Sequence, residues 1–124
     1  GVQTCALPIL AAVVYMNEFP DHDSDKQTGK NTLIVVFGPE KARFGYVALV
    51  ASAFISIVVM ALNGIFPKLT LITLISAYFG ITATTTLYKH YNSRLLQPAN
   101  WGTIYLHSAA GFLFCIGIWL GTPV

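Results

Sequence analysis

Carboxylates and a lysine gather in one short polar stretch between Asn17 and Lys30, directly after an apolar segment. All five acidic residues of the chain fall between positions 18 and 40. Asn17, Asp21 and Asp25 recur every four residues, so on a helix their side chains lie along one face. Aligned carboxylates repel one another unless a cation lies among them, and oxygen ligands favour Mg²⁺ over zinc. This spacing predicts a divalent-metal site.

Gly29 and Lys30 follow the last of these aspartates by one helical turn. A lysine offers a phosphate a compact positive charge, and a glycine allows a close approach to the backbone. Mg²⁺ held by only one or two protein carboxylates usually completes its ligand shell with water and substrate phosphate. The stretch therefore has the residue types of a combined metal and phosphate site.

Two other metal or phosphate motifs do not fit the same residues. The alternating aspartates at 21–25 begin like an EF-hand calcium loop, but its sixth position is Lys26 instead of glycine. Its twelfth position is Thr32 instead of glutamate. A P-loop is excluded because no glycine stands five residues before Gly29. A solvated acidic loop between two helices remains an alternative interpretation on composition alone.

The rest of the chain has the composition of a membrane protein. Hydrophobic residues make up 55% of it and charged residues 10%, whereas a soluble domain carries about 25% charge. At about 1.5 Å per residue, three apolar runs are long enough to cross a hydrocarbon layer of ~30 Å. They are 44–62, 69–87 and 104–120. A shorter run, 5–16, is expected to be the end of a fourth helix. We expect an all-α transmembrane helix bundle, with about three full spans plus the end of a fourth.

Basic residues predict how the spans are oriented. Six of the seven lie in 17–43 and 88–103, which share one side if three helices alternate, and that side is expected to be cytoplasmic. We expect a multi-pass protein of the cell (inner or plasma) membrane whose partners include the lipid bilayer and no nucleic acid. A transport subunit is an alternative, but its ionisable groups belong near the bilayer midplane, and no carboxylate lies within these spans.

Small residues mark one place where helices could approach closely. Gly117 and Gly121 are four residues apart in the last span, a spacing that allows close helix packing. The alternative is that they are ordinary small residues of a membrane helix.

The complete string Asn-x-x-x-Asp-x-x-x-Asp-x-x-x-Gly-Lys-x-Thr-Leu, from Asn17 to Leu33, resembles the second aspartate-rich motif of the UbiA-type intramembrane prenyltransferases. The ending Gly-Lys-x-Thr-Leu is most similar to the 1,4-dihydroxy-2-naphthoate polyprenyltransferase branch of menaquinone biosynthesis. The similarity is specific over roughly residues 15–43. Membrane CDP-alcohol phosphotransferases also use Asp-x-x-x-Asp and remain an alternative, which the Gly-Lys-x-Thr-Leu ending disfavours.

This resemblance implies a nine-helix fold with two aspartate-rich cytoplasmic loops. It implies Mg²⁺-dependent transfer of a polyprenyl group from polyprenyl diphosphate to an aromatic acceptor. Asp21 and Asp25 would be catalytic metal ligands, Asn17 a supporting ligand, and Lys30 the diphosphate-binding residue. Further candidates are more loosely connected to the motif: Asp23, Arg43 at the membrane surface, and His107 in the last span, for which a bond to a neighbouring helix is the alternative. Lys89, His90 and Arg94 could contact the diphosphate from the opposing loop, or be ordinary charges of the cytoplasmic side.

The chain departs from the family pattern in one large respect. The first aspartate-rich motif is absent, and no second acidic cluster occurs anywhere in the sequence. We therefore expect residues 10–124 to be the C-terminal part of a prenyltransferase domain, inactive without the missing N-terminal half of the same enzyme. Residues 17–43 would form its cytoplasmic aspartate-rich loop. Residues 1–9 resemble a translated sequencing-adapter string and are expected to be a non-native leader.

Overall fold

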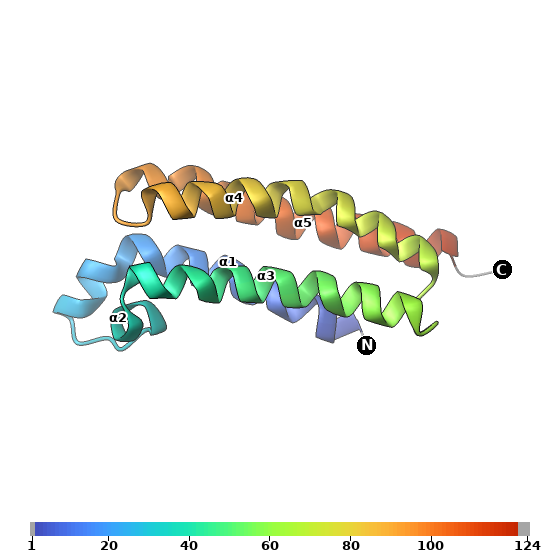
Figure 1. Cartoon of the computed structure of the whole chain (residues 1–124), viewed down its shortest axis with the longest axis horizontal. Coiled ribbons are helices and arrows are strands. Elements are labelled where there is room, and N and C mark those ends of the chain that lie inside the picture. Colours follow the sequence, from blue (N-terminus) through green and yellow to red (C-terminus); the bar gives the residue numbers. More distant parts are fainter. Residues whose placement is uncertain (1, 122–124) are drawn as a thin grey trace.

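Four long helical segments run up and down along one axis of the computed structural model, which describes residues 2–121 without the side chains of Val2, Thr4, Cys5 and Arg94 (Figure 1). They are α1 (Val2–Gln27), α3 (Pro39–Leu62), η1 (Lys68–Ser76) continued by α4 (Ala77–His90), and α5 (Gln97–Gly121). Two short helices, α2 (Leu33–Phe37) and η2 (Arg94–Leu96), lie in the connections. No strand occurs among the described residues, so the all-α prediction is confirmed.

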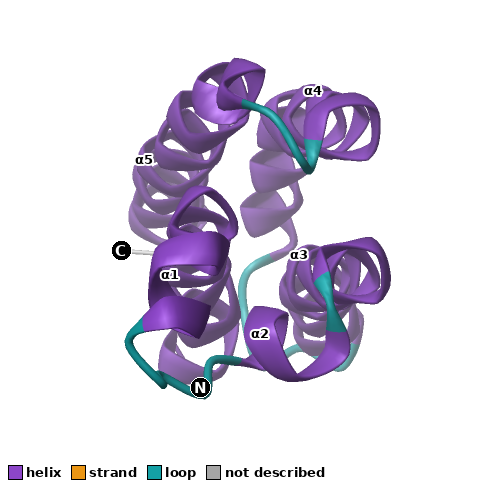
Figure 2. Ribbon diagram, turned by 90° about the vertical axis from the view of Figure 1, so that its left-hand side faces the viewer, coloured by secondary structure: helices purple, strands orange, loops and turns teal. Residues whose placement is uncertain are grey.

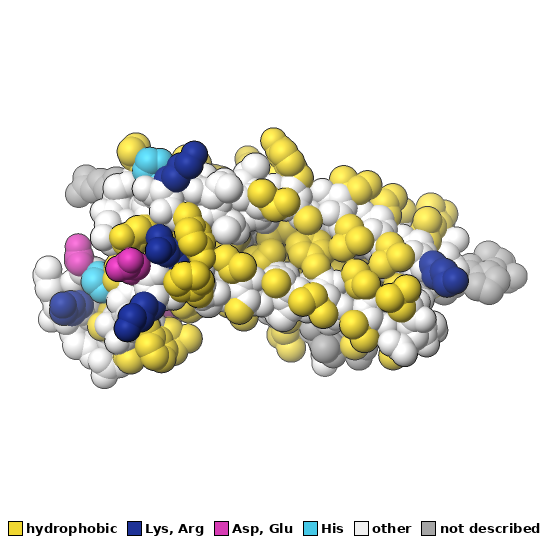
Figure 3. Space-filling view, in the orientation of Figure 1, with side chains coloured by type: hydrophobic (Ala, Val, Ile, Leu, Met, Phe, Trp, Pro, Cys, Tyr) yellow, Lys and Arg dark blue, Asp and Glu magenta, His cyan; other side chains and the backbone are white. Residues whose placement is uncertain are grey.

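Three of these segments are long and apolar enough to cross a membrane. They are Pro39–Leu62, Lys68–His90 and Gln97–Gly121, and each contains one of the expected spans. Apolar side chains cover the visible flank of the bundle, while most of the visible charged side chains gather at the end where α2 lies (Figure 3). This distribution matches a bundle surrounded by lipid, with its charged end in the aqueous phase.

The four segments pack side by side around a common core. Viewed along the bundle, α2 lies beside the ends of α1 and α3, and α4 lies beside α5 (Figure 2). The largest buried cluster lies toward the charged end and draws on every long segment. Its buried members include Met16 and Phe19 of α1, Tyr46 of α3, Leu87 of α4 and Ala99 of α5.

The acidic stretch differs from the expected loop, because α1 continues through it to Gln27. Buried residues follow one another on α1 at helical spacing, from Ala12 through Met16 to Phe19, which is only 3% exposed. Packing of Phe19 therefore extends the helix beyond the apolar run, even though Pro20 lies inside it. Only 28–32 and Gly38 separate the helices between α1 and the start of α3.

Close packing of α5 against η1 and the residue before it depends on two glycines. A Cβ built on Gly117 would lie 2.6 Å from the Cα atom of Thr70, and one built on Gly121 would collide with Pro67. The two backbones can approach this closely only because those side chains are missing. The structure thus supports the packing interpretation of this glycine pair.

A buried hydrogen bond joins α3 to α5. The hydroxyl oxygens of Tyr46 and Thr103 lie 2.9 Å apart, and both side chains are fully buried. The Thr103 hydroxyl donates its hydrogen to the Ala99 carbonyl, at 2.8 Å. The Tyr46 hydroxyl is therefore the donor in the pair with Thr103.

We expect Tyr46→Phe to lower the free energy of unfolding by about 0.5–1 kcal/mol, the usual value of an interhelical hydrogen bond in a membrane protein. Unfolding by sodium dodecyl sulfate in mixed micelles measures it. Tyr105→Phe, which removes a hydroxyl from a 54% exposed side chain, should leave stability unchanged. Equal effects of the two substitutions would show that the buried pair contributes nothing.

Candidate metal and phosphate site

The predicted aspartate face exists on the last turns of α1. Asn17 and Asp21 are exposed, and they continue a stripe begun by Leu10 and Val14, which are also exposed. The stripe therefore lies on the outer face of α1, away from the buried side that carries Met16. Asp25 shares the spacing but is 8% exposed, because the chain folds back over it after the helix ends.

Gly29 makes this reversal. The N–H of Lys30 donates to the carbonyl of Asp25 at 2.9 Å, and the N–H of Gly29 donates to that of Lys26 at 3.3 Å. These two bonds, with Gly29 at φ +74°, form a Schellman motif at the C-terminus of α1. Glycine adopts this left-handed conformation without the steric cost that a Cβ imposes. The Gly-Lys pair of the motif therefore turns the lysine back toward the helix that carries the aspartates.

Lys30 meets Asp25 as a result of this turn. Its ammonium nitrogen lies 3.0 Å from Oδ2 of Asp25. The hydrogen bond to Asp25, the largest cause, and the charges of Asp25, Glu18 and Asp21 raise the pKa of Lys30 above its ordinary 10.5, while desolvation partly opposes them. The stability that the charged lysine contributes to the fold is fully present below pH 10.5. It is lost only as the pH rises through the higher pKa of the folded state. Lys30 is therefore fully charged at neutral pH.

The next residues of the motif also have local structural roles. Thr32 caps α2, because its side-chain oxygen accepts a hydrogen bond from the N–H of Val35 at 3.3 Å. Leu33, 56% exposed, begins the helix. Each of Gly29, Lys30 and Thr32 thus fixes the short path from α1 to α2.

A groove of about 750 Å³ runs between α1 and this path. Its polar end contains Glu18, Lys30 and Asn31. The remainder is mainly apolar, formed by Leu7, Leu10, Ala11, Val14, Leu33 and Leu49, and Tyr15 and Thr32 complete the lining. The groove therefore begins at a cation and continues along the exposed outer side of α1.

We expect Gly29→Ala to be more disruptive than Gly29→Asn. A Cβ in the left-handed region costs roughly 1–2 kcal/mol, and asparagine tolerates that region better than alanine does. No atom lies within 4 Å of a Cβ at Gly29, so the difference would be conformational and not steric. SDS unfolding measures stability, and ¹⁵N NMR of the Lys30 ammonium reports the ion pair. Equal stability of the two variants would contradict the Schellman assignment.

The residue types of this site suit a magnesium ion, but their side chains are not arranged around a common point. No set of three His, Cys, Asp or Glu side chains within residues 2–121 forms a metal-binding cluster. Asp25 is paired with Lys30, whereas Asn17 and Asp21 make no hydrogen bond or ion pair among the described residues. One or two carboxylates with an amide oxygen match the sparse oxygen ligation that Mg²⁺ accepts when phosphate and water complete its shell.

Other predicted site residues lie elsewhere. Asp23, on another face of α1, contacts His22, with Oδ1 3.0 Å from Nδ1. The guanidinium of Arg43 lies over the rings of Tyr88 and Tyr91, with its Cζ atom 4.5 and 5.2 Å from their centroids. This places Arg43 between α3 and α4 and not beside the aspartates.

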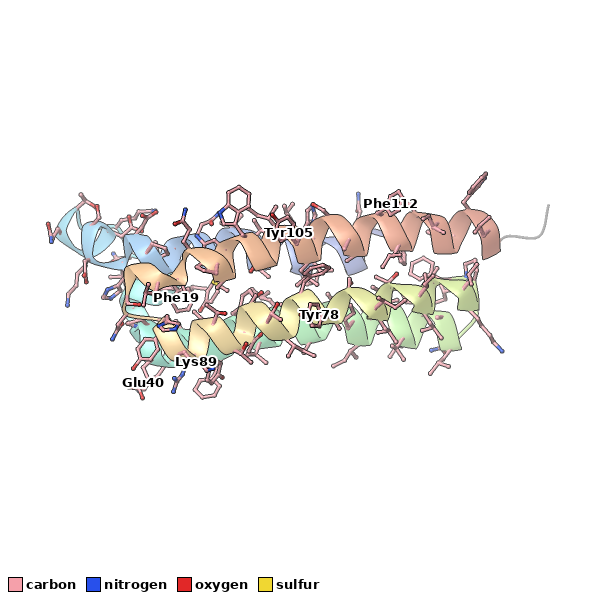
Figure 4. The ribbon with its side chains drawn as sticks, turned by 90° about the horizontal axis from the view of Figure 1, so that it is seen from above. Phe19, Glu40, Tyr78, Lys89, Tyr105 and Phe112 are labelled. Atoms are coloured by element: carbon pink, nitrogen blue, oxygen red, sulfur yellow. The ribbon has the colours of Figure 1, made fainter. Side chains whose placement is uncertain are left out.

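Residues at the end of α4 and in its connection to α5 do not lie beside the aspartates either. Lys89 and Glu40 lie together on the α3–α4 side of the charged end, across from α1, and Phe19 lies between the two sides (Figure 4). His90 is half-buried at the end of α4, and the side chain of Arg94 lies outside the described residues. His107 lies in the middle of α5 and lines a separate cavity.

Glu18 is the site residue that the motif alone does not reveal. It lines the groove with Lys30 and contributes to the raised pKa of that lysine. Its position seven residues before Asp25 corresponds to two helical turns, so the signal was present in the spacing. Recognising it required knowing that the helix continues past Met16.

Comparison with known proteins identifies the family of the chain. Residues 2–109 match the model of the UbiA prenyltransferase family. No curated protein and no solved structure gives a significant match. Because the family match covers most of the sequence, the chain belongs to the UbiA prenyltransferase family.

Proposed function

We propose that this chain carries the metal- and diphosphate-binding part of an Mg²⁺-dependent prenyltransferase. It would act on a polyprenyl diphosphate and an aromatic acceptor, 1,4-dihydroxy-2-naphthoate of menaquinone biosynthesis. One observation carries the proposal: Lys30, ion-paired with Asp25, occupies the polar end of a groove whose other walls are mainly apolar. Family membership supports prenyl transfer as the reaction class.

The groove suits a molecule with a charged head and a long apolar tail. Its lysine attracts an anion, and the leucines and Val14 of α1 provide an apolar wall that continues toward the bilayer. A polyprenyl diphosphate has this distribution of charge and apolar surface. Burying its isoprenoid carbons along the groove contributes about 25 cal/mol per Å² of apolar area.

Asp21 and Asp25, supported by Asn17, would hold the metal ion. When bound, Mg²⁺ would neutralise charge on the diphosphate leaving group. Lys30 would move from Asp25 to the diphosphate, since an ammonium on a flexible stem can exchange one anionic partner for another. This exchange would free the Asp25 carboxylate for the metal.

The reaction places two demands on the residues around the groove. The allylic C–O bond breaks with its electron pair leaving on diphosphate, the acceptor ring carbon bonds to the prenyl carbon, and the ring then loses a proton. Lys30 stabilises the charge that develops on the leaving oxygen. The apolar walls would reduce contact between the allylic cation and water, which would otherwise capture it.

Separate observations support the proposed acceptor and the proposed orientation in the membrane. The sequence Gly29-Lys30-x-Thr32-Leu33 supports the naphthoate branch. The charged end carries six of the seven basic residues in its loops and helix ends, which supports placing it on the cytoplasmic side of the cell membrane. A second acidic segment, from an N-terminal half that this sequence does not contain, would complete the metal site.

A fusion enzyme tests the proposal: residues 10–124 joined behind the N-terminal half of an active family member that carries the first aspartate-rich motif. Purified in nanodiscs with Mg²⁺ and radiolabelled polyprenyl diphosphate, it should prenylate 1,4-dihydroxy-2-naphthoate faster than 4-hydroxybenzoate. The 124-residue chain alone should transfer nothing.

Different outcomes contradict different parts of the proposal. A preference for 4-hydroxybenzoate would overturn the naphthoate branch and keep the reaction class. Transfer that persists in excess chelator would overturn the metal role. Transfer by the chain alone would overturn the need for a second acidic segment.

A further inference from the structure

A groove of about 280 Å³ lies between α3 and α4, apart from the aspartate face of α1. All of the described residues that line it belong to these two helices. Figure 3 shows this flank, where a hollow lined by apolar side chains runs between them. Both helices belong to candidate membrane spans. The groove is therefore open to the acyl chains of a surrounding bilayer.

Small side chains make the groove hollow. Gly80 is buried at its base, where a Cβ would lie only 3.2 Å from Cγ1 of Val50, so α4 approaches α3 closely there. Ala51 and Ala77 lie on the two walls, and the larger Phe54 and Ile81 lie beside them. A narrow channel between larger side chains has the shape that an extended hydrocarbon chain fills.

Two threonines line the groove without making it polar. The hydroxyl of Thr84 donates to the carbonyl of Gly80 at 2.8 Å, and that of Thr85 donates to the carbonyl of Thr82 at 2.9 Å. Each hydroxyl has a single hydrogen, and its own helix uses it. A molecule in this part of the groove therefore needs no hydrogen-bonding group.

Arg43 lies at the charged end of the groove, one turn before Val47 on the same face of α3. Its Cζ atom lies 4.5 Å from the centroid of the Tyr88 ring, and its Nε atom is buried without a hydrogen-bond partner. Its Nη2 atom lies 3.8 Å from Oε1 of Glu40, which is longer than a hydrogen bond. The rings thus hold a guanidinium whose hydrogen-bonding capacity is unused.

Lys89 adds a second cation at the same end, one turn after Thr85 on α4. It is exposed and makes no hydrogen bond or ion pair among the described residues. It lies with Glu40 on the α3–α4 side of the charged end (Figure 4). Arg43, Lys89 and Glu40 together carry a net charge of about +1 at neutral pH. Basic residues placed between membrane helices at the cytoplasmic side suit the phosphate of a lipid headgroup.

The length of the groove matches one leaflet of a bilayer. Phe54 follows Arg43 by eleven residues on α3, and Ala77 precedes Tyr88 by eleven residues on α4. Eleven residues of helix span about 16 Å at 1.5 Å per residue, and half of a hydrocarbon layer of ~30 Å is about 15 Å. The groove and its cations therefore extend from the level of the headgroups to about the middle of the bilayer.

We propose that the α3–α4 groove binds one anionic phospholipid, with its phosphate at Arg43 and Lys89 and one acyl chain along the groove. The headgroup supplies most of the selectivity, because an acyl chain gains little by leaving lipid tails that are as apolar as the groove. The site depends on neither the metal, the diphosphate nor residues 1–9.

Nuclear magnetic resonance of ¹⁵N-arginine tests the proposal on the full 124-residue chain in dodecyl maltoside micelles. The chain has two arginines, so Arg94→Lys assigns the signal of Arg43. Dioleoylphosphatidylglycerol should shift the Arg43 signal in a saturable way, and at lower concentrations than dioleoylphosphatidylcholine does. Equal affinities for the two lipids would overturn the proposal. The same saturable shift with glycerol phosphate, which has no acyl chain, would overturn the role of the groove.

A pair of lysine variants separates this site from general attraction of the chain for anionic lipid. Lys89→Gln should weaken the binding of phosphatidylglycerol about fivefold, the usual effect of one basic residue near an anionic membrane surface. Lys68→Gln makes the same change of charge at the start of η1, the other end of the same span, and should leave the affinity unchanged. Glu40→Gln should strengthen binding by removing a nearby negative charge. Equal weakening by the two lysine variants would contradict a site at Arg43.

A second pair of variants tests the acyl-chain part of the site. Ala51→Phe should fill the groove and weaken binding several-fold. Ala48→Phe places the same side chain on a different surface of α3, at an exposed position that does not line this groove, and should have no effect. Ala51→Leu provides a smaller change if the phenylalanine variant fails to fold. An affinity that is unchanged in a folded Ala51 variant would show that the lipid binds elsewhere.

Discussion

Asp25→Asn is expected to reduce kcat/KM for prenyl transfer by the fusion enzyme by roughly 10²–10³-fold, the usual effect of losing one group that stabilises transition-state charge. The substitution keeps the size of the side chain and removes the charge that pairs with Lys30 at 3.0 Å. It would weaken both metal binding and the placement of the lysine. Initial rates measured across Mg²⁺ concentrations should show a raised metal requirement as well as a lower maximal rate.

Asp23→Asn is the matched control for this result. Asp23 lies two residues away, on another face of α1, and contacts His22 instead of Lys30. Its removal should change kcat/KM by less than about threefold, within the scatter of surface substitutions. If the two variants lose activity equally, the acidic stretch acts through its total charge, and the assignment of one functional face to α1 is wrong.

Gly117→Leu is expected to have the largest effect on stability, lowering the free energy of unfolding by about 3 kcal/mol as a strongly overpacked interior substitution does. The built Cβ lies 2.6 Å from Thr70 Cα and 2.9 Å from its backbone nitrogen. These are backbone atoms, so no side-chain rotation relieves the overlap. SDS unfolding of the purified chain, followed by circular dichroism, measures the loss.

Gly111→Leu provides the comparison on the same helix. Gly111 has no atom within 4 Å of its Cβ position, so leucine should be tolerated and should gain about 0.5–1 kcal/mol of helix propensity. Similar destabilisation by both substitutions would show that α5 rejects leucine for reasons other than its contact with η1.

The spans and the aspartate face could be predicted because each depends on local pattern. Hydropathy locates 44–62, 69–87 and 104–120 without reference to their neighbours, and a four-residue spacing defines a helix face wherever the helix lies. The continuation of α1 to Gln27 could not be predicted in the same way. It depends on burial of Phe19, a contact formed with other elements and concealed by the charged residues around it.

The contacts of Lys30 in the site, and of Arg43 outside it, could not be predicted from the sequence either. The Gly-Lys pair predicts a phosphate contact, but its Schellman geometry, which directs Lys30 onto Asp25, is a property of the folded turn. Arg43 could be placed at the membrane surface from the sequence. Its stacking on Tyr88 and Tyr91 joins residues more than forty positions apart, and no local pattern indicates it.

We propose that one face of α1 and Lys30 bind a diphosphate together with a divalent metal. Paramagnetic relaxation tests it most directly: Mn²⁺ replaces Mg²⁺, and the ³¹P signals of a non-reactive polyprenyl thiodiphosphate are recorded with the fusion enzyme in nanodiscs. We predict strong Mn²⁺-dependent relaxation that is lost in the Asp21→Ala, Asp25→Ala double variant while the protein remains folded. Relaxation that is unchanged in the double variant would place the metal and the diphosphate elsewhere and contradict the account.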